Sequence, residues 1–206
     1  MHGTLSTLMN LRTILKERFG NDFVQKCDLF CEILLEWNKI HSMTKAKNFE
    51  QIYENIEDSV GFLDYFNDFN SFADIGTGAG FPGMIIAMAK PQVSSFLIEP
   101  RQKRAAFLNF AKNKIGLLNC TIVNDRAENF ASNTKIDLVC SRAVGEAKIL
   151  LEISKQFSNE QTQYLFFKGS SVENELKNLS EFEYKIIKKN ENRNYLIFKN
   201  GEKNGF

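Results

Sequence analysis

The sequence is poor in residues that hold metal ions and contains no long apolar run. It has two histidines and four cysteines, and the cysteines at positions 27, 31, 120 and 140 lack the Cys-x-x-Cys spacing of zinc sites. We therefore expect no metal site and no disulfide framework, but four reduced, buried thiols. No stretch approaches the ~18 apolar residues of a membrane span, and charged residues between 12 and 18 interrupt what would be the apolar part of a signal peptide. These absences predict a cytoplasmic protein without membrane contact.

The chain also lacks an excess of either charge. Its 26 Lys and Arg residues face 25 Asp and Glu residues, so no global field attracts a polyanion and any such contact must use a local patch. Residues 101 to 114 contain five basic residues and no acid, whereas residues 50 to 74 contain seven acids and neither Lys nor Arg. The 206-residue length predicts one domain, with at most a small extension, and we expect a monomer.

Hydrophobic periodicity divides the chain into two parts. Apolar residues recur at three- and four-residue intervals over 22–40 and 49–66, which predicts two amphipathic helices after a weaker helix in the first twenty residues. Short apolar segments at 71–75, 93–99, 121–123, 136–140 and 164–167 then alternate with helical patterns, which predicts an α/β fold with a mostly parallel sheet. Segments 184–188 and 195–198 flank a polar turn and predict a closing antiparallel hairpin. We expect a helical extension over 1–68, packed on the sheet of a core over 69–206.

A glycine-rich loop follows the first predicted strand. Glycines at 76, 78, 80 and 83 allow a sharp turn and a close approach of the backbone to a ligand. Asp74, just before the loop, can accept hydrogen bonds from loop amides and from a cationic or amino-acid ligand. Glu99, at the end of the second strand, can accept both hydroxyls of an adenosine ribose. The candidate cofactor-binding residues are therefore Asp74, Gly76, Gly78, Gly80, Phe81 and Glu99, with Phe81 packed against the cofactor or a flipped base.

The pattern Asp-x-Gly-x-Gly-x-Gly with a later acid resembles the S-adenosylmethionine pocket of Rossmann-like class I methyltransferases. In that family a mostly parallel sheet ends in an antiparallel hairpin, as expected here. The resemblance implies S-adenosylmethionine as the cofactor. It also places Ala127 and Glu128 along the adenine and leaves Arg126 free to face the substrate.

The residues near the end of the fourth strand limit the choice of nucleophile. The chain has no Asn/Asp-Pro-Pro-Tyr/Phe clamp of the kind that amine methyltransferases use, and Cys140 lacks the neighbouring proline of C5-pyrimidine enzymes. Guanine N7 is already nucleophilic at neutral pH, so its methylation needs alignment and charge rather than a general base. Arg126 and Arg142 are the candidate catalytic residues, because a guanidinium can donate paired hydrogen bonds to a guanine edge or a phosphate.

Further motifs make the resemblance more specific. Residues 36–40, 42–44, 57–59, 74–83, 126–128, 141–143 and 168–169 resemble, in order, the motifs of the bacterial small-subunit rRNA guanine-N7 methyltransferases (RsmG, formerly glucose-inhibited division protein B). This resemblance implies methylation of guanine 527 in the 530 loop of 16S rRNA, with the 30S subunit as partner. It places Gly76, Phe81, Ala127, Glu128 and Arg142 at the cofactor.

Three positions depart from that family's pattern. Asn55 stands where the family generally has histidine, Ala79 replaces a loop proline, and Ser42-Met43 replaces Asn-Leu before Thr44. The change at Asn55 puts any role for a histidine there in doubt, whereas Ala79 should only loosen the glycine turn slightly.

The basic segment after Glu99 supplies candidate RNA contacts. We predict that Arg101, Lys103 and Arg104 bind RNA phosphates, together with Lys168 at the end of the fifth strand, although a charge run is also typical of a solvated helix face. Trp37 and most of the phenylalanines fall on apolar stripes and are predicted to be core.

Two alternative functions stay open. One is a nicotinamide-dependent oxidoreductase with the same glycine loop, although His2 and His41 are remote in sequence from the strand ends. The other is a ribosome-assembly factor with this fold but without turnover.

Overall fold

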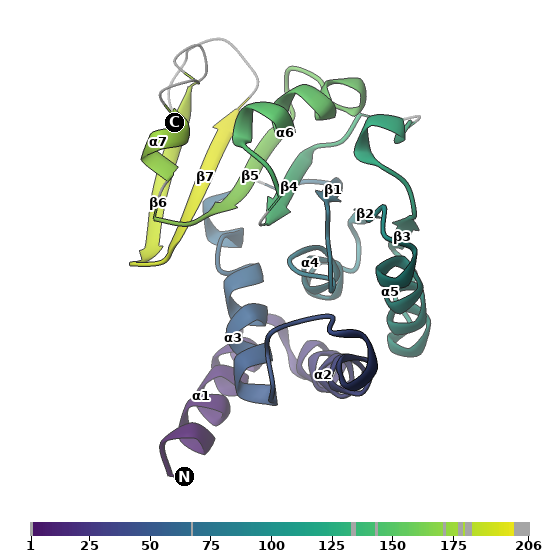
Figure 1. The fold of residues 1–206 in the computed structure, drawn as a ribbon. Helices are drawn as coiled ribbons and strands as arrows, with labels where there is room; N and C mark the ends of the chain where they lie inside the picture. Colours follow the sequence, from purple (N-terminus) through teal and green to yellow (C-terminus); the bar gives the residue numbers. More distant parts are fainter. Residues whose placement is uncertain are drawn as a thin grey trace.

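The structure is a computed structural model of the 206-residue chain and describes residues 2–66, 68–132, 135–142, 144–170, 172–176, 179 and 183–199. Its described strands form one seven-stranded sheet in the order β3-β2-β1-β4-β5-β7-β6 (Figure 1). The strands are β1 Ser71–Ile75, β2 Ser94–Ile98, β3 Cys120–Val123, β4 Leu138–Arg142, β5 Gln163–Lys168, β6 Tyr184–Asn190 and β7 Arg193–Lys199. Strands β1 to β5 run parallel, while β7 is antiparallel to both β5 and β6. The predicted α/β fold with a C-terminal hairpin is confirmed.

Helices cover both faces of this sheet. They are α1 His2–Phe19, α2 Asn21–His41, α3 Phe49–Val60, α4 Gly83–Ala89, α5 Gln102–Ile115, α6 Ala147–Ser154 and α7 Val172–Leu176, with short 3-10 helices η1 Leu63–Tyr65, η2 Ala127–Asn129 and η3 Lys155–Phe157. Helices α1 to α5 lie on one side of the sheet in Figure 1, and α6 lies on the other. Each face has its own hydrophobic cluster, so the sheet is buried on both sides as a parallel sheet requires.

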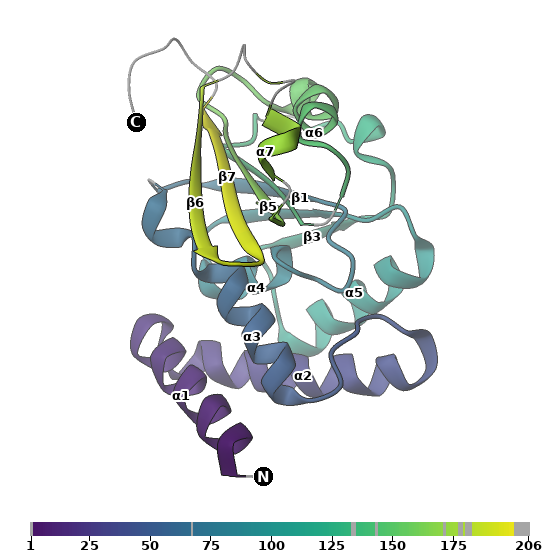
Figure 2. The ribbon, with the colours of Figure 1, turned by 60° about the vertical axis from the view of Figure 1, so that its left-hand side comes forward.

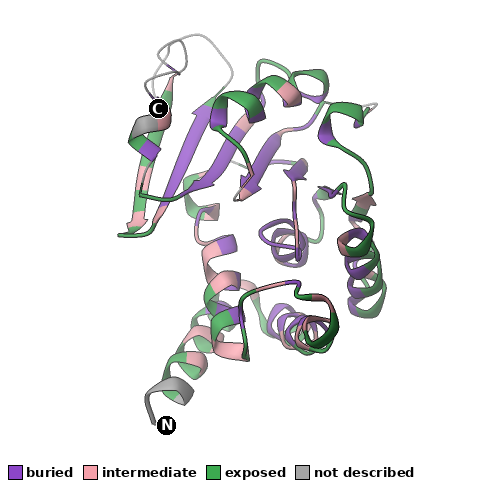
Figure 3. Cartoon of the chain, viewed as in Figure 1, coloured by how far each residue is buried: buried purple, intermediate pink, exposed green. Residues whose placement is uncertain are grey.

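The first three helices pack as an outer layer beneath α4 and α5 (Figure 2). Helix α1 contacts α2 and α3, α3 contacts α4, and α2 contacts α5. Phe30 and Ile56 belong to the same hydrophobic cluster as Phe72 and Leu97 of the sheet, and the inner sides of these helices are buried while their outer sides are exposed (Figure 3). The N-terminal helices therefore share the core of the sheet. The boundary at residue 68 stays a prediction.

The topology decides where a ligand can bind. Strand β1 pairs with β2 on one side and β4 on the other, so the direction of strand order reverses at β1. In open α/β sheets, ligands bind beyond the carboxyl ends of the strands at such a switch point. The loops after β1, β2 and β4 meet at this edge. Strand β4 ends at Arg142, which places that residue within the strand itself.

Candidate active site at the carboxyl ends of the strands

The glycine loop after β1 needs glycine for both conformation and space. Gly76, Gly78 and Gly80 have φ angles of 71°, 62° and 95°, in the left-handed region that disfavours side chains. A Cβ on Gly76 would lie 2.4 Å from Cγ2 of Val144, which follows β4. The Gly76 N–H donates to the Ile98 carbonyl at 2.8 Å and thereby ties the loop to the end of β2.

Asp74 is completely buried beneath this loop. Its Oδ2 accepts a hydrogen bond from the Gly83 N–H at 2.8 Å, and a Cβ on Gly83 would lie 2.7 Å from that oxygen. Its Oδ1 and the Thr77 hydroxyl oxygen are buried without a hydrogen-bond partner among the described residues. Burial raises the pKa of Asp74 to about 6, against the opposing effects of the nearby Thr77 hydroxyl, the Gly83 N–H and the Arg142 charge. An unused carboxylate oxygen in this position is suited to the ammonium group of an amino-acid ligand.

Glu99 connects the loop to α5. Its Oε2 accepts from the Gly78 N–H at 3.0 Å, and its Oε1 accepts from the Arg101 N–H at 2.9 Å. Arg104 Nη1 lies 3.9 Å from Oε2, and the Glu99 side chain is only 3% exposed. A carboxylate has about four acceptor positions. Glu99 can therefore hold the loop and still accept hydrogen bonds from ribose hydroxyls.

A cavity of about 470 Å³ opens between the ends of β1, β2 and β4 and the segment after β3. It brings together these sequence-predicted residues: Gly76, Glu99, Arg101, Arg104, Arg126, Ala127 and Glu128. The Arg126 and Glu128 side chains are 74% and 51% exposed, with Nε and Oε2 3.9 Å apart. The Glu99 carboxylate, the glycine backbone and the mixed apolar wall fit the ribose and adenine of S-adenosylmethionine. Asp74 is buried beneath the glycine loop and does not line this cavity.

Arg142, unlike Arg126, does not line this cavity. Its guanidinium carbon lies 4.8 Å from the centroid of the Phe81 ring, and its side chain is 14% exposed. Nη1 donates to Asn55 Oδ1 at 3.0 Å and lies 3.6 Å from Asp58 Oδ2. Burial lowers the pKa of Arg142, while the Asp58 charge opposes that shift. Both partners come from α3, which the sequence analysis did not connect to this arginine.

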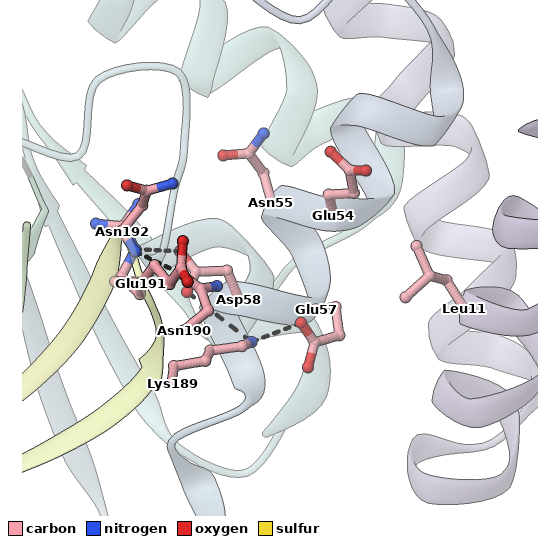
Figure 4. A pocket seen from close by; sticks show the side chains of 10 residues that line it. Leu11, Glu54, Asn55, Glu57, Asp58, Lys189, Asn190, Glu191 and Asn192 are labelled. Carbon is pink, nitrogen blue, oxygen red and sulfur yellow. Dashed lines mark hydrogen bonds and ion pairs between the residues drawn. The ribbon is translucent and has the colours of Figure 1, made fainter.

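Asp58 links three elements at this point. Its Oδ2 lies 3.0 Å from Arg193 Nε, and its carbonyl accepts from the Tyr195 hydroxyl at 3.1 Å. Lys189 Nζ pairs with Glu57 and lies 3.9 Å from Asp58 Oδ1. Figure 4 shows Glu57, Asp58 and Lys189 at a cavity of about 570 Å³ between α3 and the β6–β7 turn. The acidic run at 50–74 was the available sequence feature, but Lys189, Arg193 and Tyr195 lie more than a hundred residues further along the chain.

Like Asp74, Glu99 and Ala127, the predicted site residues Phe81 and Lys168 are buried. Phe81 is 5% exposed, and its ring packs edge-on against Phe30 with centroids 5.4 Å apart, so it faces the core and Arg142. Lys168 is 7% exposed, and its Nζ donates to Glu175 Oε2 at 2.7 Å and to the Gly145 carbonyl at 2.9 Å. Helix α7, which was not predicted, supplies Glu175. As an RNA contact Lys168 stays a prediction, as do the more exposed Arg101, Lys103 and Arg104.

The departures from the family pattern occupy distinct environments. Asn55 occupies the histidine position and accepts the Arg142 hydrogen bond, while Ala79 is buried in the core. Ser42 has a φ of 48° and ends α2 in the left-handed conformation. The four cysteines are free and buried, and burial raises the pKa of each thiol.

Among the described residues, no helix is both long and apolar enough to cross a membrane.

Comparisons with known proteins show which family the chain resembles. A family model described as rRNA small subunit methyltransferase G matches residues 24–204. Ribosomal RNA small subunit methyltransferase G of Aliarcobacter butzleri is 42% identical over 182 residues, covering 88% of this chain and 93% of the relative. The protein of the same name from Wolinella succinogenes is 39% identical over 183 residues, covering 89% of this chain and 92% of the relative.

Solved structures support the fold alone. An S-adenosylmethionine-dependent methyltransferase from Aquifex aeolicus is similar with a TM-score of 0.58 at 14% identity, covering 69% of this chain and 89% of that one. An rRNA methylase from Streptococcus thermophilus has a TM-score of 0.54 at 12% identity, and the match covers 72% of this chain and 97% of that one. With the sequence matches, this establishes that the chain belongs to the rRNA small subunit methyltransferase G family, whose members are S-adenosylmethionine-dependent enzymes.

Proposed function

We propose that this chain methylates N7 of a guanine in the rRNA of the small ribosomal subunit, at position 527 of the 530 loop as in the family it resembles. Membership of the family makes the chain an S-adenosylmethionine-dependent rRNA methyltransferase. The choice of atom and the roles of residues are our proposal. The observation that carries it is the placement of Arg142, held at the end of β4 between the glycine loop and α3.

The cofactor would be held by residues at the ends of three strands, β1, β2 and β3. Asp74 would accept from its ammonium group, Glu99 would accept from the ribose hydroxyls, and Ala127 and Glu128 would line the adenine. The backbone of the glycine loop would approach its chain closely, which the positive φ angles allow. When bound, the cofactor supplies a methyl group on a positively charged sulfur.

The residues around the target base would act by positioning guanine N7 for attack on the methyl group. Guanine N7 carries a lone pair in the ring plane and no proton, so no base has to remove one before attack. Arg142 is restrained by Asn55, Asp58 and Phe81, and it would donate to guanine O6 while leaving N7 free. A donor fixed before the reaction costs little reorganisation in the transition state. Arg126, exposed at the cavity edge, would contact the RNA near the base.

Tritium transfer from labelled S-adenosylmethionine to undermethylated 30S subunits and to free 16S rRNA tests this function. Borohydride and aniline cleavage would locate N7-methylguanine. Cleavage at the 530-loop guanine is the expected result, and the better substrate of the two shows whether the enzyme reads RNA alone or a ribosomal surface. Label on another base atom would overturn the N7 assignment. Cofactor binding without transfer would favour the assembly-factor alternative, whereas family membership already argues against the oxidoreductase.

A further inference from the structure

The outer side of α5 carries two cations around an exposed aromatic ring. Lys103, Phe110 and Lys114 follow one another at spacings of seven and four residues, so they lie along one side of the helix. Phe110 is 41% exposed, and Lys114 Nζ lies 5.8 Å from the centroid of its ring. The ion pairs among the described residues include neither Lys103 nor Lys114, and residues 101 to 114 contain no acid. Their charge is therefore available to a partner.

Helix α2 extends this ring into a row. The centroid of Trp37 lies 5.6 Å from that of Phe110 and 5.4 Å from that of His41, one helical turn further along α2. Trp37 is anchored by the fully buried Phe107, at 5.5 Å, but is itself only partly buried. Helices α2 and α5 contact one another, as Figure 1 shows. We call His41, Trp37 and Phe110 the aromatic row.

We propose that the aromatic row and the flanking Lys103 and Lys114 form a second RNA-binding surface, which binds single-stranded rRNA outside the active site. Unpaired bases would stack on the rings, and the lysines would neutralise the phosphates between them. Stacking suits every base because each has a π-face, so this surface would add affinity without selecting a sequence. The inference rests on the proposed function for the identity of its ligand.

The position of the surface fits an RNA strand that also enters the active site. Helix α5 starts beside the cofactor cavity, which Arg101 and Arg104 line. Phe110 lies eight residues after Gln102, about 12 Å along the helix axis at 1.5 Å per residue. This separation allows a nucleotide near the target to reach the aromatic row. It also keeps the row out of contact with the reacting atoms, so it would affect binding rather than the chemical step.

Trp37 provides a direct test because it is the only tryptophan in the chain. A short single-stranded oligouridylate should quench its fluorescence saturably, and a duplex of equal length should quench it much less. Phe110→Ala should weaken oligonucleotide affinity about tenfold, as expected for the loss of one stacked base. The double variant Lys103→Gln/Lys114→Gln should make the negative slope of log affinity against log salt shallower by about 1.4. Tyr65→Ala, at a 53% exposed aromatic outside the surface, is the matched control and should change neither.

Methyl-transfer kinetics test this inference independently of the proposed function. Phe110→Ala should raise KM for undermethylated 30S subunits about tenfold and leave kcat nearly unchanged. Unaltered affinity and quenching in Phe110→Ala would overturn the inference even if methylation proceeds normally. A variant impaired only on 30S subunits, with normal oligonucleotide binding, would assign the surface to a ribosomal protein and also overturn it. Quenching lost with Phe110 but no methyl transfer by the wild type would support the surface and overturn the proposed function.

Discussion

Arg142 Nη1 donates a hydrogen bond to Asn55 Oδ1 across 3.0 Å, which joins the end of β4 to the middle of α3. The two residues are 87 positions apart in the chain, and Asp58, one helical turn beyond Asn55, lies 3.6 Å from the same nitrogen. The N-terminal helices therefore orient the side chain that we place nearest the target base.

Replacing Arg142 should remove methyl transfer but not the fold. Loss of one positioned donor lowers kcat about 100- to 1000-fold. We expect Arg142→Ala to lower kcat by at least this factor. Asp58 would keep its contact with Arg193 at 3.0 Å, so the carboxylate would not be left buried and unpaired. Methylation kinetics and circular dichroism on the same preparation check both statements. Wild-type turnover in this variant would disprove the role given to Arg142.

Asn55 should act through Arg142 rather than on the substrate. We expect Asn55→Ala to lower kcat about tenfold with little change in KM for S-adenosylmethionine, because Arg142 loses a partner but not its charge. Asn55→His should restore activity only when the imidazole is neutral and can accept the hydrogen bond. The activity of this variant should therefore decrease as the pH drops below about 6.5, the ordinary pKa of histidine. A pH profile identical to that of the wild type would contradict a positioning role.

The buried carboxyl of Asp74 should make both stability and cofactor affinity depend on pH. Its folded-state pKa of about 6 lies above the ordinary 3.8, so the folded state holds a proton that the unfolded chain releases between pH 4 and 6. The cofactor-free protein should thus lose stability relative to Asp74→Asn as pH rises through this window, by about 3 kcal/mol in total.

Cofactor affinity should show the opposite trend. The positive charge of S-adenosylmethionine favours ionised Asp74, so its affinity should rise as pH passes about 6 in the wild type and stay flat in Asp74→Asn. Urea unfolding and calorimetric titration at pH 4.5, 6 and 7.5 measure the two effects. Equal pH dependence of cofactor affinity in both proteins would remove Asp74 from the cofactor site.

Two glycine substitutions separate backbone strain from loss of space. Gly76→Ala and Gly116→Ala both place a side chain at a positive φ, 71° and 80° respectively. At Gly116 nothing lies within 4 Å of the new Cβ, so we expect only the strain of about 1–2 kcal/mol. At Gly76 the Cβ would lie 2.4 Å from Val144, so we expect a larger loss and no cofactor binding. Similar stabilities and intact cofactor binding in both variants would show that the loop tolerates a side chain.

Much of the architecture could be predicted from local sequence patterns. The α/β alternation, the glycine loop and the closing hairpin depend on spacings within one or two elements, and the structure confirms each of them. Short elements were harder to predict. Helix α7 has five residues, too few for a hydrophobic period to be recognised, and the pairing of its Glu175 with Lys168 was missed with it.

Hydrophobic periodicity did not predict how deeply the aromatic residues are buried. Trp37 falls on an apolar stripe, which predicts burial, yet it is only partly buried where α2 meets α5. Phe81 is buried and packs edge-on against Phe30, and its contact with the cofactor stays a prediction. A stripe defines the side of a helix that faces the protein. How deeply each residue on it lies depends on the neighbouring helix.

The sequence by itself determined the elements, the glycine loop and the acids at the ends of β1 and β2, because each depends on backbone conformation and spacing along one short segment. Only the tertiary structure decided the partners of Arg142 and the meeting of Trp37 with Phe110. Those contacts join residues that are distant in the chain, and packing of α2 and α3 against the core brings them together. Charge and hydrophobicity can be read from a sequence, whereas the distance between two charges or two rings is set only when the layers pack.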